Sequence, residues 1–382
     1  MKRPIHRKRP EVHESPGRLL IIGFEGTEIS PRLASLLREI QPAGVILFAR
    51  NIKNAEQTWR LLRECQKCVA APLFTCVDLE GGTVDRFRDA LGPTPSAADI
   101  FATADRKLYR EHGRIIGENC RALGFNVDFA PVFDLAFATS RKVMTSRAVS
   151  ADPDETIAYA RGFLSGLRAA AVLGCGKHFP GLGEGTLDSH QSLPEIAKPL
   201  KKMWSEDLLP YRRLRNTLPF VMVAHAAYPA VTGDNIPASL SRQWVSEILR
   251  KRIGYRNLIV SDDLEMGGVL AAAPIGEAAV EAISAGSDLC LVCHHEDRVR
   301  EVHEELIRAA ERDRKFAKHA EGSSARVMAF KKKCARILRP ARTAPSKKKL
   351  EALERTLWEF SEQVRLESLN RAEATATRAG RT

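Results

Sequence analysis

Eight short apolar runs, each followed by a stretch with helical periodicity, constrain the fold of this chain more than any other feature. Most of these runs are continuously apolar rather than alternating, which is typical of parallel strands buried on both faces. The predicted strands span Leu19–Phe24, Gly44–Phe48, Leu73–Asp78, Asn126–Ala130, Ala171–Lys177, Phe220–Ala224, Leu258–Ser261 and Asp288–Val292. The predicted helices include Ser30–Ile40, Ala55–Val69, Ala98–Leu123, Asp154–Ala169, Met203–Arg215, Arg242–Lys251, Glu277–Ala285 and Asp297–Ala310.

Alternating strands and helices of this number can form a closed TIM barrel or an open doubly wound sheet. Polar residues stand at the ends of many different runs, namely Asp78, Asp128, Lys177-His178, His225 and Asp262-Asp263. In a barrel the carboxyl ends of all strands meet on one face, whereas in an open sheet only those near the switch point meet. The pattern therefore favours an α/β fold built as a single (β/α)8 TIM barrel.

The positive charge of the chain lies mainly at its two ends. Of a net charge of +12, residues 1–18 carry +4 (six Lys/Arg, two Glu), residues 311–382 carry +10 (19 Lys/Arg, nine Asp/Glu), and residues 19–310 carry −2. We therefore expect a basic N-terminal tail (1–18), a catalytic barrel (19–310) and a basic helical C-terminal extension (311–382). We expect the tails to be solvated rather than to bind nucleic acid.

An amphipathic helix is predicted within the C-terminal extension. Apolar residues recur there at spacings of three and four, at Leu350, Leu353, Leu357, Phe360 and Val364. Such a helix can dock on the barrel or pair with a partner chain, and we favour docking.

Composition and cysteine usage indicate an ordinary intracellular globular protein. The chain is 44% hydrophobic and 28% charged, which excludes disorder of the whole chain. It has no apolar run of the ~18 residues that a membrane span needs, and no apolar stretch follows the basic N-terminus, so we expect a cytoplasmic protein without membrane contact. Its eight cysteines are scattered, and we expect them to be reduced and mostly buried.

The most informative stretch for chemistry runs from Lys177-His178, at the end of a strand, through three glycines to Asp188-Ser189-His190. In extended chain, residues i and i+2 point the same way, which places Asp188 beside His190. A carboxylate beside an imidazole fixes its tautomer and raises its pKa. The stretch therefore predicts a proton-transfer group on a loop. The alternative is a solvated surface histidine.

A second stretch ends a buried strand on two adjacent carboxylates, Asp262-Asp263. Burying a charge there is costly without a partner or a purpose. We predict that Asp262 is a nucleophile. The alternative for this pair is a helix N-cap, for which Asp263 is the candidate.

A third stretch places Asp78 at a strand end, before Gly81-Gly82 and Arg86. A carboxylate in this position can accept hydrogen bonds from two sugar hydroxyls, with Arg86 orienting it or reaching the ligand. The alternative is a structural salt bridge. Arg147 is a lone loop arginine, and His294-His295 has no partner at metal-ligand spacing, so we interpret the pair as structural. Nothing in the sequence demands a metal or a cofactor.

Taken together, these stretches resemble the NagZ-type bacterial β-N-acetylhexosaminidases of glycoside hydrolase family 3, over roughly residues 19–310. The stretches that carry the resemblance, in the family's order and spacing, are Leu47-Phe48-Ala49-Arg50-Asn51, Asp78-Leu79-Glu80-Gly81-Gly82, Asn126 to Asp134, Lys177 to His190, Ala224-His225, Ser261-Asp262-Asp263-Leu264 and Ala285-Gly286-Ser287-Asp288. The sequence departs from the family pattern at Leu182, where histidine is common, at Glu184-Gly185, where Asp-Thr is usual, and at Thr83, where arginine is common.

The resemblance implies a retaining glycosidase on a TIM barrel. Asp262 would be the nucleophile and His190 the general acid/base, with Asp188 as its partner. The residues that would bind the GlcNAc unit are Asp78, Arg86, Arg147, Lys177 and His178. This arrangement departs from the usual pair of carboxylates in retaining glycosidases.

The implied activity is that of an exo-β-N-acetylglucosaminidase acting on terminal β-linked GlcNAc, with muropeptides of peptidoglycan recycling as substrates. One alternative is another family 3 β-glycosidase, such as a β-glucosidase, against which the Lys-His and Asp-x-His residues argue. A second alternative is an inactive barrel that binds sugar or RNA, against which the intact catalytic residues argue.

Overall fold

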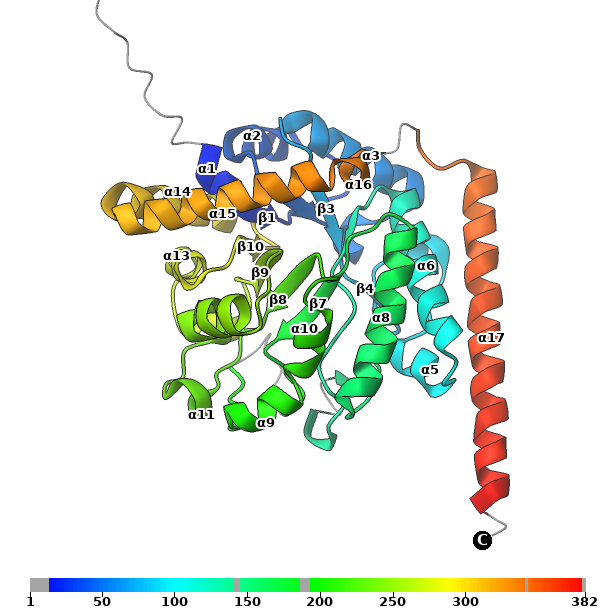
Figure 1. Ribbon diagram of the computed structural model, residues 1–382. Helices are drawn as coiled ribbons and strands as arrows, with labels where there is room; N and C mark the ends of the chain where they lie inside the picture. The colour runs from blue at the N-terminus through cyan, green and yellow to red at the C-terminus, as the bar shows by residue number, and fades with distance from the viewer. Residues whose placement is uncertain (1–13, 141–143, 186–192, 341–342, 380–382) are drawn as a thin grey trace, which may run out of the picture.

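The computed structural model describes residues 14–140, 144–185, 193–340 and 343–379, with side chains described up to residue 371. Eight parallel strands form one sheet in the order β6-β3-β2-β1-β10-β9-β8-β7 (Figure 1). The strands are β1 (Leu20–Ile22), β2 (Gly44–Ile46), β3 (Phe74–Val77), β6 (Val127–Asp128), β7 (Cys175–Phe179), β8 (Phe220–Val223), β9 (Leu258–Asp263) and β10 (Leu289–Val292).

The sheet closes on itself between β6 and β7. The backbone N–H of Asp128 donates to Leu173 O at 2.9 Å, and that of Cys175 donates to Ala130 O at 2.8 Å. Single parallel bridges join Val127 to Leu173 and Val132 to Lys177. The predicted (β/α)8 TIM barrel is therefore confirmed, and all eight predicted strands are present. The predicted start of β7 at Ala171 was too early, because Ala171 has φ 57° and lies in the turn that follows α8 (Pro153–Ala169).

Helices surround the barrel, and most lie where the sequence predicts them (Figure 1). The longer ones are α2 (Pro31–Ile40), α3 (Ala55–Cys68), α6 (Arg106–Leu123), α8 (Pro153–Ala169), the π-helix η4 (Gln243–Arg252), α13 (Ile275–Ala285) and α14 (Glu296–Arg312). The short ones are α1 (Glu14–Gly17), α4 (Arg88–Leu91), α5 (Ala97–Ala102), α9 (Leu200–Ser205), α10 (Leu209–Leu214), α11 (Pro229–Thr232), α12 (Gly267–Leu270) and α16 (Ala335–Leu338).

Two predicted helices are each broken into two. The prediction of one helix over Ala98–Leu123 was wrong, because Ala104 takes φ 53° and Asp105 starts α6 as an N-cap that accepts from Lys107 N at 2.8 Å. The prediction over Met203–Arg215 was wrong because Pro210 lacks a backbone donor and belongs to the first turn of a new helix, α10.

The amino end of the barrel is closed by α15 (Arg314–Lys333), which crosses it beside α13 and α14 (Figure 1). Val327 and Phe330 join the apolar interior of the barrel, where the Phe330 ring lies 5.7 Å from that of Phe220. Lys331 donates to Ala43 O at 2.6 Å, and burial lowers its pKa to about 7. This helix therefore contributes to the barrel core, although it lies beyond residue 310, where we expected the extension to begin.

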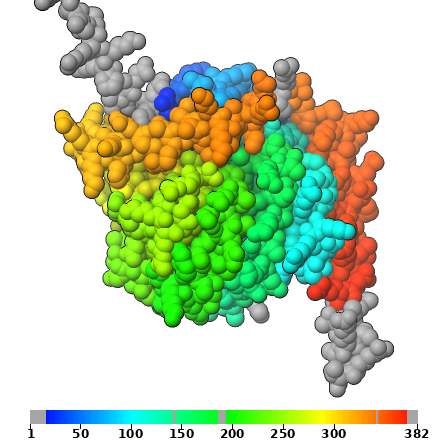
Figure 2. Space-filling model, viewed as in Figure 1, coloured from blue at the N-terminus to red at the C-terminus, as the bar shows by residue number. Residues whose placement is uncertain are grey.

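The last helix, α17 (Lys347–Ala379), packs along α5 and α6 on the flank of the barrel. Its buried residues are Leu353, Leu357, Phe360 and Val364, as predicted for a docked amphipathic helix. Figure 2 shows it in contact with this flank. Trp358 faces outward and is 66% exposed.

The cysteines have the unpaired, mostly buried state that we expected. All eight cysteines are unpaired, and all but Cys334 are buried. Among the described residues, no helix is both long enough and apolar enough to cross a membrane.

Candidate active site

A cavity of about 140 Å³ opens at the carboxyl ends of the barrel strands. Six of the eight predicted site residues line it, namely Asp78, Arg86, Arg147, Lys177, His178 and Asp262. Further polar and aromatic lining comes from Phe48, Glu80, Asp263 and His294. Residues from segments as distant as 48 and 294 meet here because the strand ends of a closed barrel share one face.

A buried ion network forms one wall of the cavity. Lys177, at the centre of β7, places Nζ 2.7 Å from Asp78 Oδ1 and 2.6 Å from Glu80 Oε1. Arg147 donates to both oxygens of Glu80, from Nε at 2.8 Å and from Nη2 at 2.9 Å. Two cations and two carboxylates therefore compensate one another in a place from which water is largely excluded.

Glu80 is central to this network, although no role was predicted for it from the sequence. It lies in β4 (Leu79–Gly81), which pairs with β5 (Val84–Asp85) in a hairpin beside the cavity. Its side chain is only 3% exposed. Burial by itself would raise the pKa of Glu80, but Arg147 and Lys177 outweigh this and hold that pKa well below its usual value. Burial would likewise lower the pKa of Lys177, yet Asp78 and Glu80 raise it.

A second carboxylate without a predicted role, Asp134, fixes the orientation of His178. Asp134 Oδ2 lies 2.6 Å from His178 Nδ1, and its Oδ1 accepts from Leu182 N at 2.7 Å. The carboxylate of Asp134 can only accept a hydrogen bond, so the imidazole of His178 carries a proton on Nδ1. Nε2 is therefore the ring atom that remains for a ligand in the cavity. Asp134 lies in the stretch Asn126 to Asp134 quoted above, which was the signal for it.

The two adjacent aspartates on β9 have different environments. Asp262 lines the cavity, is half-buried, and accepts from Asp263 N through Oδ1 at 2.9 Å. Asp263 Oδ1 accepts from Glu265 N at 3.1 Å and from Cys293 N at 3.2 Å. The alternative, that Asp263 is a helix N-cap, was wrong, because the N-cap of the next helix, α12 (Gly267–Leu270), is Met266. Asp263 instead ties β9 to the end of β10.

The interpretation of His294 as merely structural was also incomplete. His294 lines the cavity, and its ring stacks on that of Phe48 with centroids 5.5 Å apart. A hydrogen bond to Asp263, with Nε2 3.3 Å from Oδ2, raises the pKa of His294. The neighbouring His295 bonds Glu265 instead, at 2.6 Å.

Arg86 approaches the same aromatic ring from the β4–β5 hairpin. Its guanidinium carbon lies 5.6 Å from the centre of the Phe48 ring. Its Nε is buried, and among the described residues it has no hydrogen-bond partner. A buried cationic donor without an acceptor is costly, so this N–H is available to a ligand in the cavity.

Asp128 and His225 lie at the carboxyl ends of their strands, as predicted, but they do not line the cavity. Asp128 accepts from Leu79 N at 2.9 Å, and burial raises its pKa well above the usual value. His225 bonds Ser239 Oγ at 2.7 Å and the carbonyl of Asp263 at 3.0 Å. Both side chains therefore brace the strand ends that carry the site.

The predicted acid/base pair, Asp188 and His190, lies outside the described residues. The described start of this loop is anchored, with Gly185 N bonded to Leu182 O at 2.8 Å. Glu184 lies 3.3 Å from Lys198 Nζ and does not line the cavity. Within the described part of the chain, no group of three or more His, Cys, Asp or Glu side chains could hold a metal ion.

Comparison with known proteins agrees with this geometry. The family model described as "Glycosyl hydrolase family 3 N terminal domain" matches residues 12–330. A beta-hexosaminidase of Alkalilimnicola ehrlichii is 37% identical over 287 residues, covering 73% of this chain and 82% of that protein. One of Bordetella parapertussis is 38% identical over 308 residues, covering 78% and 86%.

Solved structures show the same similarity. A family 3 β-N-acetylglucosaminidase from Paenibacillus sp. str. FPU-7 superimposes with a TM-score of 0.84 at 31% identity, covering 90% of this chain and 68% of that one. NagZ from Neisseria gonorrhoeae, solved in complex with N-trifluoroacetyl-D-glucosamine, gives a TM-score of 0.70 at 29% identity, covering 85% and 98%. The chain therefore belongs to glycoside hydrolase family 3, as a member of its β-N-acetylhexosaminidase type.

Proposed function

We propose that this chain is a retaining exo-β-N-acetylglucosaminidase that removes terminal β-linked GlcNAc. The observation that carries the proposal is the single small cavity in which Lys177, Asp78, Arg86 and His178 face Asp262. Its volume of about 140 Å³ lies below the ~300–1,000 Å³ of sites for larger ligands. A cavity of this size suits one terminal sugar unit rather than a stretch of polysaccharide.

The network leaves defined donors and acceptors for that sugar. An ammonium has three donors, and Lys177 uses two of them on Asp78 and Glu80, so one remains for a hydroxyl. The second oxygen of Asp78, Nε2 of His178 and Nε of Arg86 supply further positions. Arg147, held by Glu80, completes the proposed binding set.

The reaction that we propose is a double displacement. Asp262 attacks the anomeric carbon and forms a glycosyl-enzyme while His190, supported by Asp188, gives a proton to the leaving oxygen. In the second step His190 takes a proton from water, which attacks the anomeric carbon and frees Asp262. No cofactor or metal takes part in this proposal.

The decisive experiment compares turnover of an aryl β-GlcNAc with that of the matching aryl β-glucoside. We expect clear preference for the GlcNAc substrate and a β-configured first product by NMR. Preference for the glucoside would favour the β-glucosidase alternative. Binding of the sugar without turnover of either substrate would favour an inactive binding barrel.

We further propose that the natural substrates are GlcNAc-terminated muropeptides and that the enzyme acts in the cytoplasm during peptidoglycan recycling. The proposal of muropeptide substrates rests on the family resemblance of the sequence. The cavity itself supports only the binding of one sugar unit. Release of GlcNAc from purified muropeptides, measured against release from chitobiose, tests it. Faster release from chitobiose would contradict a muropeptide preference.

A further inference from the structure

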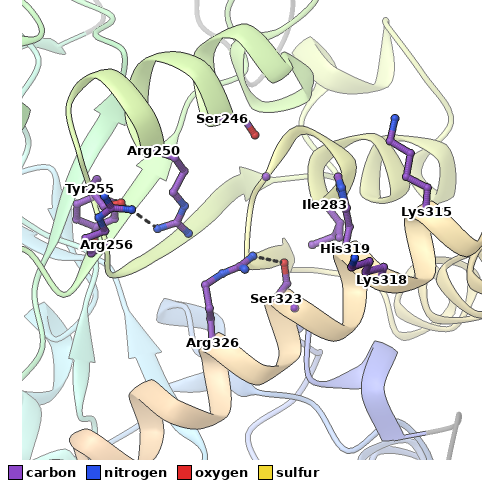
Figure 3. Close-up of a pocket in the computed structure, with 12 residues that line it drawn as sticks. Ser246, Arg250, Tyr255, Arg256, Ile283, Lys315, Lys318, His319, Ser323 and Arg326 are labelled. Atoms are coloured by element: carbon purple, nitrogen blue, oxygen red, sulfur yellow. Dashed lines mark hydrogen bonds between the residues drawn. The ribbon is translucent and has the colours of Figure 1, made fainter.

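A second and larger cavity, of about 560 Å³, lies at the opposite end of the barrel. One wall comes from η4 and from Tyr255 and Arg256, which lead into the amino end of β9. The other wall is α15, the helix that closes this end of the barrel (Figure 3). The two walls lie about 70 residues apart in sequence, since they centre near residues 250 and 320.

The lining of this cavity, here called the basal cavity, is strongly cationic. It carries Arg250, Arg256, Lys315, Lys318 and Arg326, together with His319, and no aspartate or glutamate is among the described residues that line it. A single buried carboxylate, Asp288, lies behind the wall and binds both Arg250 and Arg326. That carboxylate can neutralise one of the two, so the cavity keeps an excess of positive charge.

The arginine of the α15 wall is held in place before any ligand arrives. Arg326 Nε donates to Asp288 at 2.6 Å. Its Nη2 donates to Ser323 Oγ at 2.8 Å (Figure 3). Its Nη1 has no hydrogen-bond partner within the described part of the chain. A guanidinium fixed in this way loses little conformational entropy when it binds an anion.

A glycine within α15 keeps the basal cavity open. Gly322 lies inside a 20-residue helix, where glycine is less favourable than alanine. An added Cβ at this position would meet only Arg326 Nη1, at 3.5 Å, an ordinary contact distance. Helix packing therefore does not require glycine here, whereas any larger side chain would reduce the space beside Arg326.

We propose that the basal cavity binds a small molecule that carries two or more phosphate groups. Cations from both walls converge on it, so one polyanion can bridge η4 and α15 and relieve the repulsion among them. Besides Asp288, two acidic residues, Glu281 and Asp313, line an adjoining hollow together with Lys315 and His319. The phosphates should therefore lie at the other end, among Arg250, Arg256 and Arg326.

The test is calorimetric titration of the full chain with inorganic pyrophosphate at fixed ionic strength. Arg256→Gln and Lys318→Gln remove exposed charges, so neither should disturb the fold, and each should weaken binding at least fivefold. Gly322→Leu should block binding by filling the cavity, with folding checked by its thermal transition. Lys348→Gln, an exposed lysine on α17, is the matched control and should bind as the wild type does.

Several results would overturn the proposal. One is no binding of pyrophosphate by the wild type at 10 mM, and another is unchanged affinity in both charge variants. Loss of binding in Arg86→Gln would place the anion in the active-site cavity instead. Binding of long RNA without any binding of pyrophosphate would show a non-specific basic surface.

Discussion

Replacing Glu80 by glutamine should separate the electrostatic role of the buried network from its packing. Glutamine keeps the size of the side chain but removes the charge that faces Arg147 and Lys177. The wall of the cavity then holds two cations and only Asp78 as a carboxylate. A glutamine amide has one accepting oxygen, so at most two of the three charge-assisted hydrogen bonds can survive, as weaker bonds to a neutral group, and its NH2 group faces a donor of Arg147 or Lys177.

The size of the effect follows from these three bonds. Hydrogen bonds to charged groups contribute about 1.5–3 kcal/mol each, and breaking a buried ion pair outright costs about 3–5 kcal/mol. We therefore expect Glu80→Gln to lower the free energy of unfolding by about 2–4 kcal/mol at pH 7. The Michaelis constant for an aryl β-GlcNAc should rise, because Lys177 and Arg147 lose the group that positions them.

The loss of stability should depend on pH with a definite sign. The folded-state pKa of Glu80 is lowered from the usual 4.5. Its stabilisation is therefore complete above pH 4.5 and is lost as the pH falls below that value towards the folded pKa. Urea unfolding at pH 7 and at successively lower pH should show the variant and the wild type converging in acid.

Glu56 provides the matched control for this experiment. It pairs with Arg60 on the surface of α3, and both side chains are more than 60% exposed. Glu56→Gln should change stability by less than about 1 kcal/mol at any pH. A Glu80→Gln protein as stable as this control at pH 7, or one whose deficit does not shrink in acid, would refute the account of the network.

Three further predictions test the proposed chemistry and the domain boundary. A fluorinated GlcNAc analogue should add its glycosyl mass to a peptide containing Asp262; labelling elsewhere would remove Asp262 as nucleophile. His190→Ala should slow turnover of natural substrates by about 10²–10⁴-fold and should slow aryl substrates chiefly in the deglycosylation step, with partial rescue by azide. Asp188→Asn should give a milder loss of activity and a shifted pH profile. Wild-type rates on a muropeptide in His190→Ala would assign the acid/base role to another residue. A chain ending at Pro340 keeps α15 but loses α17, so it should retain kcat for an aryl β-GlcNAc while melting at a lower temperature; a large fall in kcat with the fold intact would make α17 part of the site.

The barrel could be predicted because each of its strands is marked by a pattern within a few consecutive residues. Each strand is a short apolar run, and a polar residue where the run stops marks the carboxyl end, so Asp78, Lys177 and Asp262 could be placed on one face from sequence alone. Helix breaks were harder to predict. The break before α6 depends on the positive φ of Ala104, a residue whose type favours helix.

The partners within the site could not be predicted in the same way. Glu80 and Arg147 lie 67 residues apart, and their bidentate contact exists only after the β4–β5 hairpin has folded over the strand ends. His294 was discounted because no metal-ligand spacing involves it, yet it meets Phe48 across the barrel mouth. Sequence shows which polar residues reach the mouth, while the closed sheet decides which of them touch.

The two cavities differ in the balance of their charges, and this difference points to different ligands. In the mouth, Lys177 and Arg147 are matched by Asp78 and Glu80, so that wall offers hydrogen bonds with no net charge. An uncharged sugar has many hydroxyls that can form hydrogen bonds with such a wall. Because the wall has no net charge, free anions have little tendency to occupy the site in place of the sugar. The basal cavity has five cationic side chains and one carboxylate behind them, which favours anions over neutral ligands. Because α15 forms one wall of the basal cavity and also closes the barrel core with Phe330, an anion bound there should stabilise the fold and leave the chemistry at the mouth unchanged.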